Sequence, residues 1–226
     1  MKLEIGDVFS NTIATARDRA GPLMGLWGVF LVFQIALVAV LFGMIGGGAA
    51  IFSGSFENPS TLNALGMGAG IVFLLLIAYF IYLYLYCVQS TAMALAASSR
   101  TLASFGDALS GGFRSGLSLL GVFMLLLVGY FIFTFVIGIA QLILSFLGSF
   151  GEGIVGLASF AAFVYAACRF VVIVPVVAVD GERNPVKAIR RSWEITEGHV
   201  LPIFVIVLIV GIAAIGLGVV FGLLFG

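Results

Sequence analysis

The residues best suited to recognition or chemistry lie in one polar stretch, DGERNPVKAIRRSWEITEGH, from Asp180 to His199. It carries eight of the twenty charged side chains of the chain. Asn184 is suited to cap a helix, and Pro185 suits the first helical position, where no N–H is needed. Gly198 favours a helix end, and Val200 opens the next apolar run. The stretch therefore predicts a short helix directly before a hydrophobic segment.

This predicted helix is amphipathic. Its apolar residues recur at helical steps and its charged residues occupy the other faces. The apolar set is Val186, Ile189, Trp193 and Val200, and the charged set is Lys187, Arg190, Arg191, Glu194 and Glu197. A helix of this kind is too polar to cross a bilayer and lies at the water–lipid boundary. We expect Lys187, Arg190, Arg191 and Trp193 to contact lipid, the alternative being an ordinary solvated loop between two spans.

A second candidate is Arg169, the one base of ten that lies inside an apolar segment. Arg at mid-membrane costs on the order of 2.5 to 3.5 kcal/mol on insertion scales, so it should face protein or water. It shares a helix face with the small residues Ala158, Ala162 and Ala166, a spacing typical of close helix packing. No acidic residue lies within a predicted span, so the expected partners are backbone carbonyls, Gln34, Gln89, Gln141, tyrosine hydroxyls or a lipid phosphate. Three roles stay open for Arg169: a packing residue, a site for an anionic headgroup or substrate, and a side chain that snorkels to the surface.

The same region carries a resemblance to a known family. Arg169 stands six residues before Pro175, then come VDGERNP and AIRRSWEITEGH, leading into the last span. This pattern resembles the membrane domain of some bacterial glycerophosphoryl diester phosphodiesterases and is similar to the YciC-type inner-membrane proteins. It is best over residues 165 to 205, with further similarity in IGDVFSNTIATARDRAGPLMGLW near the N-terminus. Some relatives add a soluble phosphodiesterase barrel that this sequence lacks, so the resemblance implies a fold and an inner-membrane setting, and no catalytic activity.

Composition places the chain among membrane proteins. Hydrophobic residues make up 62% and charged residues 9%, with a mean hydropathy of +1.28. A soluble domain could not bury so much apolar surface. The formal net charge is zero, which argues against a nucleic-acid partner. Cys87 and Cys168 lie in apolar runs and there is one His, so we predict no disulfide framework, metal site or cofactor.

We predict an all-α polytopic membrane protein with a single membrane domain. A bilayer takes roughly 20 helical residues. On that basis the spans are residues 23–46, 68–98, 116–147, 154–179 and 200–224, and three amphipathic surface helices are expected at 3–20, 100–115 and 184–198. The breaks between them are Gly21-Pro22, Gly46-Gly47-Gly48 with a loop at 49–67, and a tight turn at 148–153. The first apolar run follows a long polar segment and is expected to stay as an anchor.

The order of these elements indicates three units, at 3–98, 100–179 and 184–226. Each unit begins with a surface helix and continues with one or two spans. Gly6-Asp7-x-x-Ser10 and Gly106-Asp107-x-x-Ser110 occupy matching places in the first two. The third unit has one span, whereas proteins that this chain resembles usually have six spans in all. Either a partner supplies the missing contact or five spans suffice.

The distribution of bases predicts the orientation. Nine of the ten lie before the first span or in the connections after the second and fourth, namely Lys2, Arg17, Arg19, Arg100, Arg114, Arg183, Lys187, Arg190 and Arg191. By the positive-inside rule, the N-terminus and all three surface helices face the cytoplasm.

The remaining polar and small residues favour packing over chemistry. Gly211, Ala214, Gly218 and Gly222 form a smooth stripe that predicts a helix contact within the chain or with a second copy. Tyr79, Tyr82, Tyr84 and Tyr86 fit an interfacial or intrabundle role, and His199 fits a helix cap. There is no G-x-S-x-G, H-E-x-x-H, phosphate loop or intramembrane Asp pair.

We therefore expect a non-enzymatic bacterial inner-membrane protein that binds or organises lipid or supports a membrane complex, with lipids and a second copy or another membrane subunit as its partners. The alternative is a small transporter or channel in which Arg169 lies in an anion path lined by Gln34, Gln89, Gln141 and Tyr130. An intramembrane enzyme is a third reading.

Overall fold

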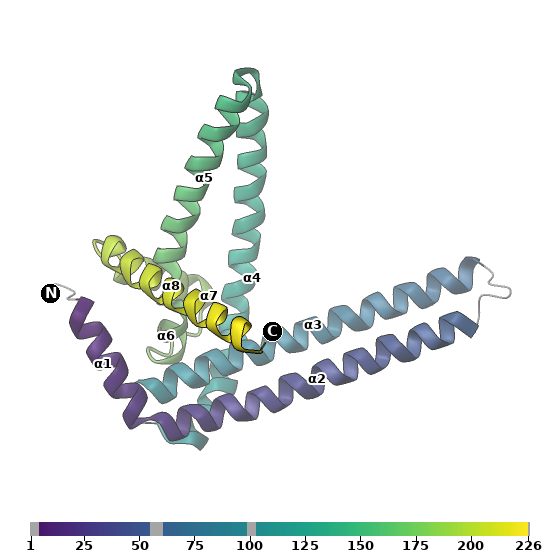
Figure 1. Ribbon diagram of the computed structural model, residues 1–226, viewed down its shortest axis with the longest axis horizontal. Helices are drawn as coiled ribbons and strands as arrows, with labels where there is room; N and C mark the ends of the chain where they lie inside the picture. The colour runs from purple at the N-terminus through teal and green to yellow at the C-terminus, as the bar shows by residue number, and fades with distance from the viewer. Residues whose placement is uncertain (1–4, 55–60, 99–102, 226) are drawn as a thin grey trace. The chain divides into compact units, whose positions relative to one another are not determined.

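The regular secondary structure of the chain is helical throughout the residues that the computed structural model describes, which are 5–54, 61–98 and 103–225 (Figure 1). No strand occurs among them, which confirms the predicted all-α class. The elements are α1 Ile5–Asp18, α2 Ala20–Gly54, α3 Thr61–Ala97, α4 Phe105–Leu144, the short η1 Ser145–Leu147, α5 Ser149–Phe170, α6 Ile173–Ala178, α7 Pro185–Ile195 and α8 Val200–Phe225.

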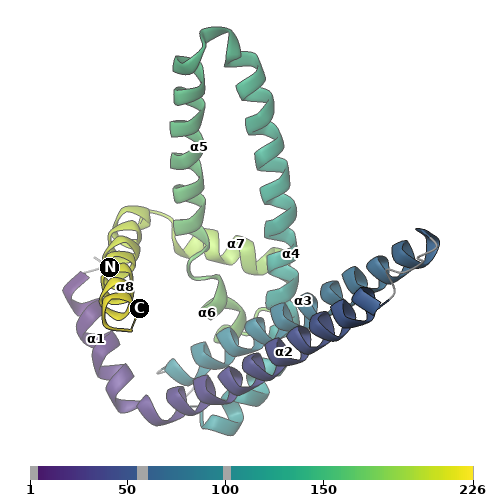
Figure 2. The same ribbon diagram turned by 45° about the vertical axis from the view of Figure 1, so that its right-hand side comes forward.

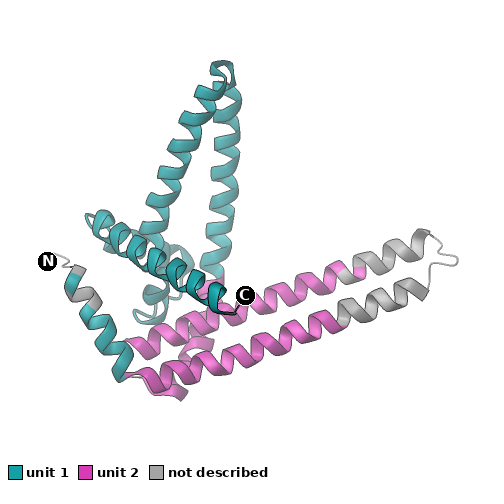
Figure 3. Ribbon diagram, viewed as in Figure 1, with its two compact units in different colours: residues 1–18, 121–226 teal, residues 19–120 magenta. Residues whose placement is uncertain are grey.

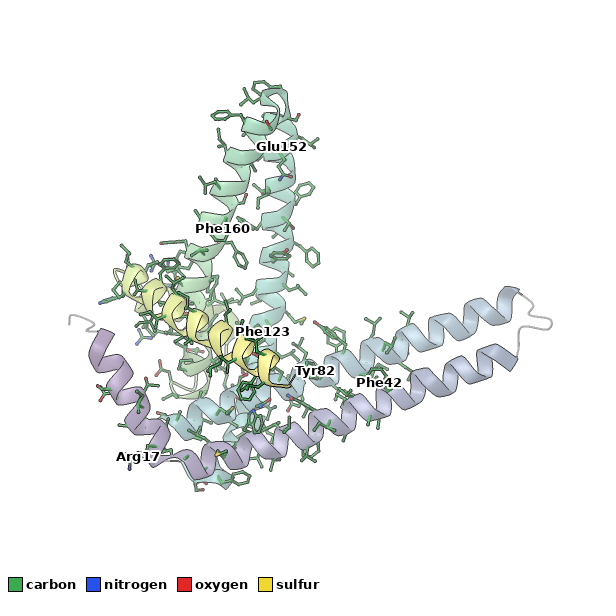
Figure 4. All side chains as sticks on the ribbon, viewed as in Figure 1. Arg17, Phe42, Tyr82, Phe123, Glu152 and Phe160 are labelled. Atoms are coloured by element: carbon green, nitrogen blue, oxygen red, sulfur yellow. The ribbon has the colours of Figure 1, made fainter. Side chains whose placement is uncertain are left out.

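Five stretches of these helices are long and apolar enough to cross a membrane, as the sequence predicted. They are Ala20–Gly43, Val72–Ala97, Phe105–Leu147, Ser149–Ala178 and Val200–Leu224. Their side chains point outward along much of their length: Phe42 is 72% exposed and Phe160 66% exposed (Figure 4). The charged residues Arg17 and Glu152 lie close to helix ends, Arg17 in the last turn of α1 and Glu152 in the first turn of α5. Lipid is the solvent that such an apolar surface requires.

Two predicted breaks around α2 are wrong. Gly21-Pro22 lies in the first turn of α2, and the chain turns at Arg19 instead, because proline is tolerated where no N–H partner is needed. Helix α2 also continues through the three glycines at 46–48 to Gly54, and α3 begins at Thr61, so much of the loop expected at 49–67 is helical. Within lipid, no water competes for the backbone hydrogen bonds, so glycine ends a helix less readily than in water.

The polar segment expected as a surface helix at 100–115 is the start of α4, which runs unbroken from Phe105 to Leu144. Arg100 lies outside the described residues. The start is fixed by a reciprocal cap in which Ser104 and Asp107 bond to each other, at 2.6 Å between the Oγ and Oδ2 atoms and 3.3 Å from the Asp107 N–H to the Ser104 Oγ. Separate surface helices are therefore present at α1 and α7.

The residues group into two compact units, which are residues 1–18 with 121–226 (unit 1) and residues 19–120 (unit 2) (Figure 3). In unit 2, α2 lies beside α3 around a core that is closed by the start of α4. Gln34 donates to Gln89 across the α2–α3 contact at 2.9 Å, and the Arg19 guanidinium caps the Ala96 carbonyl of α3 at 2.9 Å. The core residues are Leu26, Phe30, Val88, Ala92, Ala96 and Ala108.

In unit 1, α4 and α5 form a hairpin that turns at Gly148, whose φ is +61°, and that widens away from the turn (Figures 1 and 2). Helix α7 crosses the open end of the hairpin. Its first residue, Pro185, lies so close to α4 that a Cβ atom on Gly121 would stand 2.8 Å from the Pro185 Cγ. Its other end packs on α5. The surface helix is therefore held at both ends.

The contact between Gly121 and Pro185 predicts that Gly121→Ala lowers the stability of the protein in detergent by about 1 to 3 kcal/mol, the usual effect of overpacking a close contact. Gly129→Ala is the matched control, since it lies in the same helix with nothing within 4 Å of its Cβ position. The free energy of unfolding of each variant is measured in mixed micelles. Equal stability of the two would show that α7 does not need this contact.

Candidate functional site

The candidate site is built on a break in the fourth span. The sequence predicted one helix from 154 to 179, but α5 ends at Phe170 and α6 begins at Ile173. The cause is Pro175, which has no N–H to donate to the carbonyl four residues earlier and whose ring crowds that position. Carbonyl groups in the last turn of α5 therefore need partners from outside the helix.

Helix α7 supplies such partners to the carbonyl oxygen of Arg169. The Ser192 hydroxyl donates to it at 2.7 Å, and the Thr196 hydroxyl lies 3.4 Å from it. Ser192, Thr196 and Ala188 are fully buried and recur every four residues, so they form one face of α7. This small, partly polar face is what packs on α5.

The Arg169 side chain makes the reverse connection. It is only 8% exposed. Its Nε and Nη2 groups donate to the Tyr165 hydroxyl oxygen at 3.0 and 2.7 Å, and its Nη1 group donates to the Trp193 carbonyl at 3.0 Å. Arg169 therefore points into protein and bonds to a carbonyl and a tyrosine hydroxyl, two of the expected kinds of partner.

Aromatic rings enclose the guanidinium group. Its Cζ atom lies 4.8 Å from the centre of the Trp193 ring and 5.2 Å from that of Tyr165, distances at which ring faces attract cations. The Trp193 ring also packs edge-on against the Tyr165 ring at 5.9 Å between centroids, and it lies tilted against the Phe170 ring at 5.7 Å. No carboxylate pairs with Arg169 among the described residues, so rings and neutral oxygens offset its charge.

The predicted glutamine partners of Arg169 are engaged differently. Gln34 and Gln89 bond to each other, and Gln141 is exposed on α4. Tyr130, the fourth side chain proposed for an anion path, is also exposed. Gln141 and Tyr130 make no hydrogen bond to Arg169 among the described residues.

Outside its buried face, α7 exposes both apolar and charged side chains. The exposed apolar residues flank the buried face, with Val186 and Trp193 on one flank and Ile195 on the other. Lys187, Arg190 and Arg191 are exposed as well, and Glu194 pairs with Arg190 at 3.0 Å and with Arg191 at 3.9 Å. The cap at Asn184 is confirmed, because its Oδ1 accepts from the N–H groups of Val186 and Lys187. The predicted amphipathic helix is thus present, and the side chains of all three bases are exposed.

The predicted helix-packing stripes stay predictions. Ala158 and Ala162 are exposed and Ala166 is half-buried, while Gly211 is half-buried and Ala214, Gly218 and Gly222 are exposed. Tyr79, Tyr82 and Tyr86 are exposed, and Tyr84 packs against the core of residues 19–120. His199 lies just before α8 and accepts the Ile203 N–H through its carbonyl, as a helix cap does.

The fold and this site define an all-α, multi-pass membrane protein. No protein-family model matches the chain, and no curated protein or solved structure matches it either. The family resemblance therefore remains an expectation.

Sequence reasoning missed Tyr165, Ser192 and Thr196 as parts of the site. The signal was present in the spacing. Tyr165 precedes Arg169 by one helical turn, and Ala188, Ser192 and Thr196 recur every four residues opposite the charged side chains of α7. Small polar residues at such spacing indicate a face that contacts another helix closely.

Removing the Ser192 hydroxyl tests the α5–α7 connection. We expect Ser192→Ala to lower stability by about 1 kcal/mol or more, because the buried Arg169 carbonyl loses its closest donor. Ser110→Ala is the control, since that hydroxyl donates to the Asp107 carbonyl at an exposed position where water can replace it. Thermal unfolding of both variants in detergent is the measurement, and equal midpoints would argue against a stabilising role for Ser192.

Proposed function

We propose that the protein is a non-enzymatic integral membrane protein that binds anionic lipid through α7 and so organises the lipid around it or supports a membrane complex. The observation that carries the proposal is the position of α7. The helix is fixed to the spans by its small face, while its bases and several of its apolar residues are exposed. Such a combination is typical of interfacial helices, whose affinity depends on apolar area and charge together.

The cellular setting belongs to the same proposal. The distribution of bases supports a cytoplasmic N-terminus and a cytoplasmic position for α7, where anionic lipids would attract basic segments. The resemblance to the membrane domain of glycerophosphoryl diester phosphodiesterases and to YciC-type proteins supports a bacterial inner membrane. A second copy or another membrane subunit is the further partner that we propose, in contact with the exposed stripes of α5 and α8.

Two changes on α7 should act in opposite directions. Arg190→Glu together with Arg191→Glu should weaken binding to anionic lipid, because each base near a charged surface contributes about 1 kcal/mol. Glu194→Gln should strengthen it, because both arginines lose their intramolecular partner and the local positive charge rises by one.

The measurement is the enrichment of phosphatidylglycerol over phosphatidylcholine around the purified protein in nanodiscs of mixed composition. Repeating it at high salt checks the electrostatic origin, since screening should reduce the difference between variants. Unchanged enrichment in both variants would rule out α7 as the lipid-binding element.

A further inference from the structure

The Arg169 site contains a buried positive charge that no carboxylate among the described residues neutralises. A guanidinium group has five N–H donors. Three of them are directed at the Tyr165 hydroxyl and the Trp193 carbonyl. Both of these acceptors are neutral, and no described carboxylate pairs with the group. The site therefore lacks an anion, although its cation is more than nine-tenths buried.

The Tyr165 hydroxyl connects this charge to the outside. Its oxygen accepts two N–H groups from the same guanidinium, so both lone pairs are turned towards Arg169 and the O–H hydrogen is turned away. Within the described part of the chain this O–H donates to no residue. Tyr165 is 43% exposed, so a ligand can reach the hydroxyl without displacing Arg169.

An anionic oxygen is the ligand that fits such a donor. The O–H is polarised by the cation behind it, and a hydrogen bond to a charged acceptor is about twice as strong as one between neutral groups. The exposed rings of Tyr165 and Trp193 beside it favour a ligand that is partly apolar. We propose that the Tyr165 hydroxyl, backed by Arg169, binds a phosphate oxygen of an anionic phospholipid headgroup.

This proposal rests on the proposed lipid binding and makes it specific. The bases of α7 attract any anionic lipid, whereas the Tyr165–Arg169 pair would hold one headgroup at a defined place. A zwitterionic lipid fits less well because its own cation lies next to its phosphate and is repelled by Arg169.

Native mass spectrometry of the full chain tests the proposal, with phosphatidylglycerol and phosphatidylcholine added in equal amounts. We expect the wild-type protein to retain phosphatidylglycerol and Tyr165→Phe to lower its occupancy about tenfold, the effect of one hydrogen bond to a charged group. Tyr130→Phe is the matched control, because Tyr130 is also exposed on a span, and this variant should leave occupancy unchanged. Wild-type occupancy in Tyr165→Phe overturns the proposal.

A double variant separates the hydroxyl from the bases of α7. Arg190→Glu with Arg191→Glu should leave the Tyr165-dependent lipid in place. If this double variant changes no lipid binding at all while Tyr165→Phe does, the role proposed for α7 fails and the headgroup site stands.

A phosphate oxygen can come from a lipid headgroup or from a free phosphate ion, and adding inorganic phosphate distinguishes the two. The lipid-free protein should not retain inorganic phosphate, because the free ion lacks the apolar chains that lie against the rings. Tyr165-dependent retention of phosphate, without retention of phosphatidylglycerol, would assign the site to a free anion and overturn the lipid proposal.

Discussion

The buried charge of Arg169 constrains this part of the molecule more than any other interaction. An isolated buried cation is costly, and it is tolerated only where hydrogen bonds and electrostatic partners replace water. Here the partners are the Tyr165 hydroxyl and ring from α5 and the Trp193 carbonyl and ring from α7. Half of this environment belongs to the surface helix. Burial of Arg169 and docking of α7 on the end of α5 are therefore one event.

The break after Phe170 makes the connection reciprocal. A carbonyl left without a donor inside lipid costs several kcal/mol, because no water reaches it. The Arg169 carbonyl is satisfied by Ser192, while the Arg169 side chain satisfies the carbonyl of Trp193. One residue of α5 thus both donates to and accepts from α7. Two independent bonds from a single residue fix the rotation of α7, which determines which of its sides meets protein, lipid and water.

Sequence predicted the five spans, the cap at Asn184 and the inward direction of Arg169, because these follow from hydropathy, local capping and the cost of burying charge. It failed at the glycines of α2 and at the start of α4, where turn signals learned from water-soluble proteins compete with an environment that favours unbroken helices. The break before Pro175 was missed because hydropathy is continuous there. Spacing marks Tyr165 and the small face of α7 as contact positions, but it does not encode that this face meets Arg169, which lies 23 to 27 positions away.

The double role of Trp193 explains how a partly exposed helix keeps its position on the spans. Its ring and its carbonyl both contact Arg169, yet the side chain stays partly exposed beside Val186. An interfacial tryptophan normally adjusts its depth in the headgroup region. Here the ring is held from within the protein, since moving it outward would separate it from the guanidinium group. The bases Lys187, Arg190 and Arg191 precede Trp193 on the same helix, so their position relative to the spans also depends on Arg169.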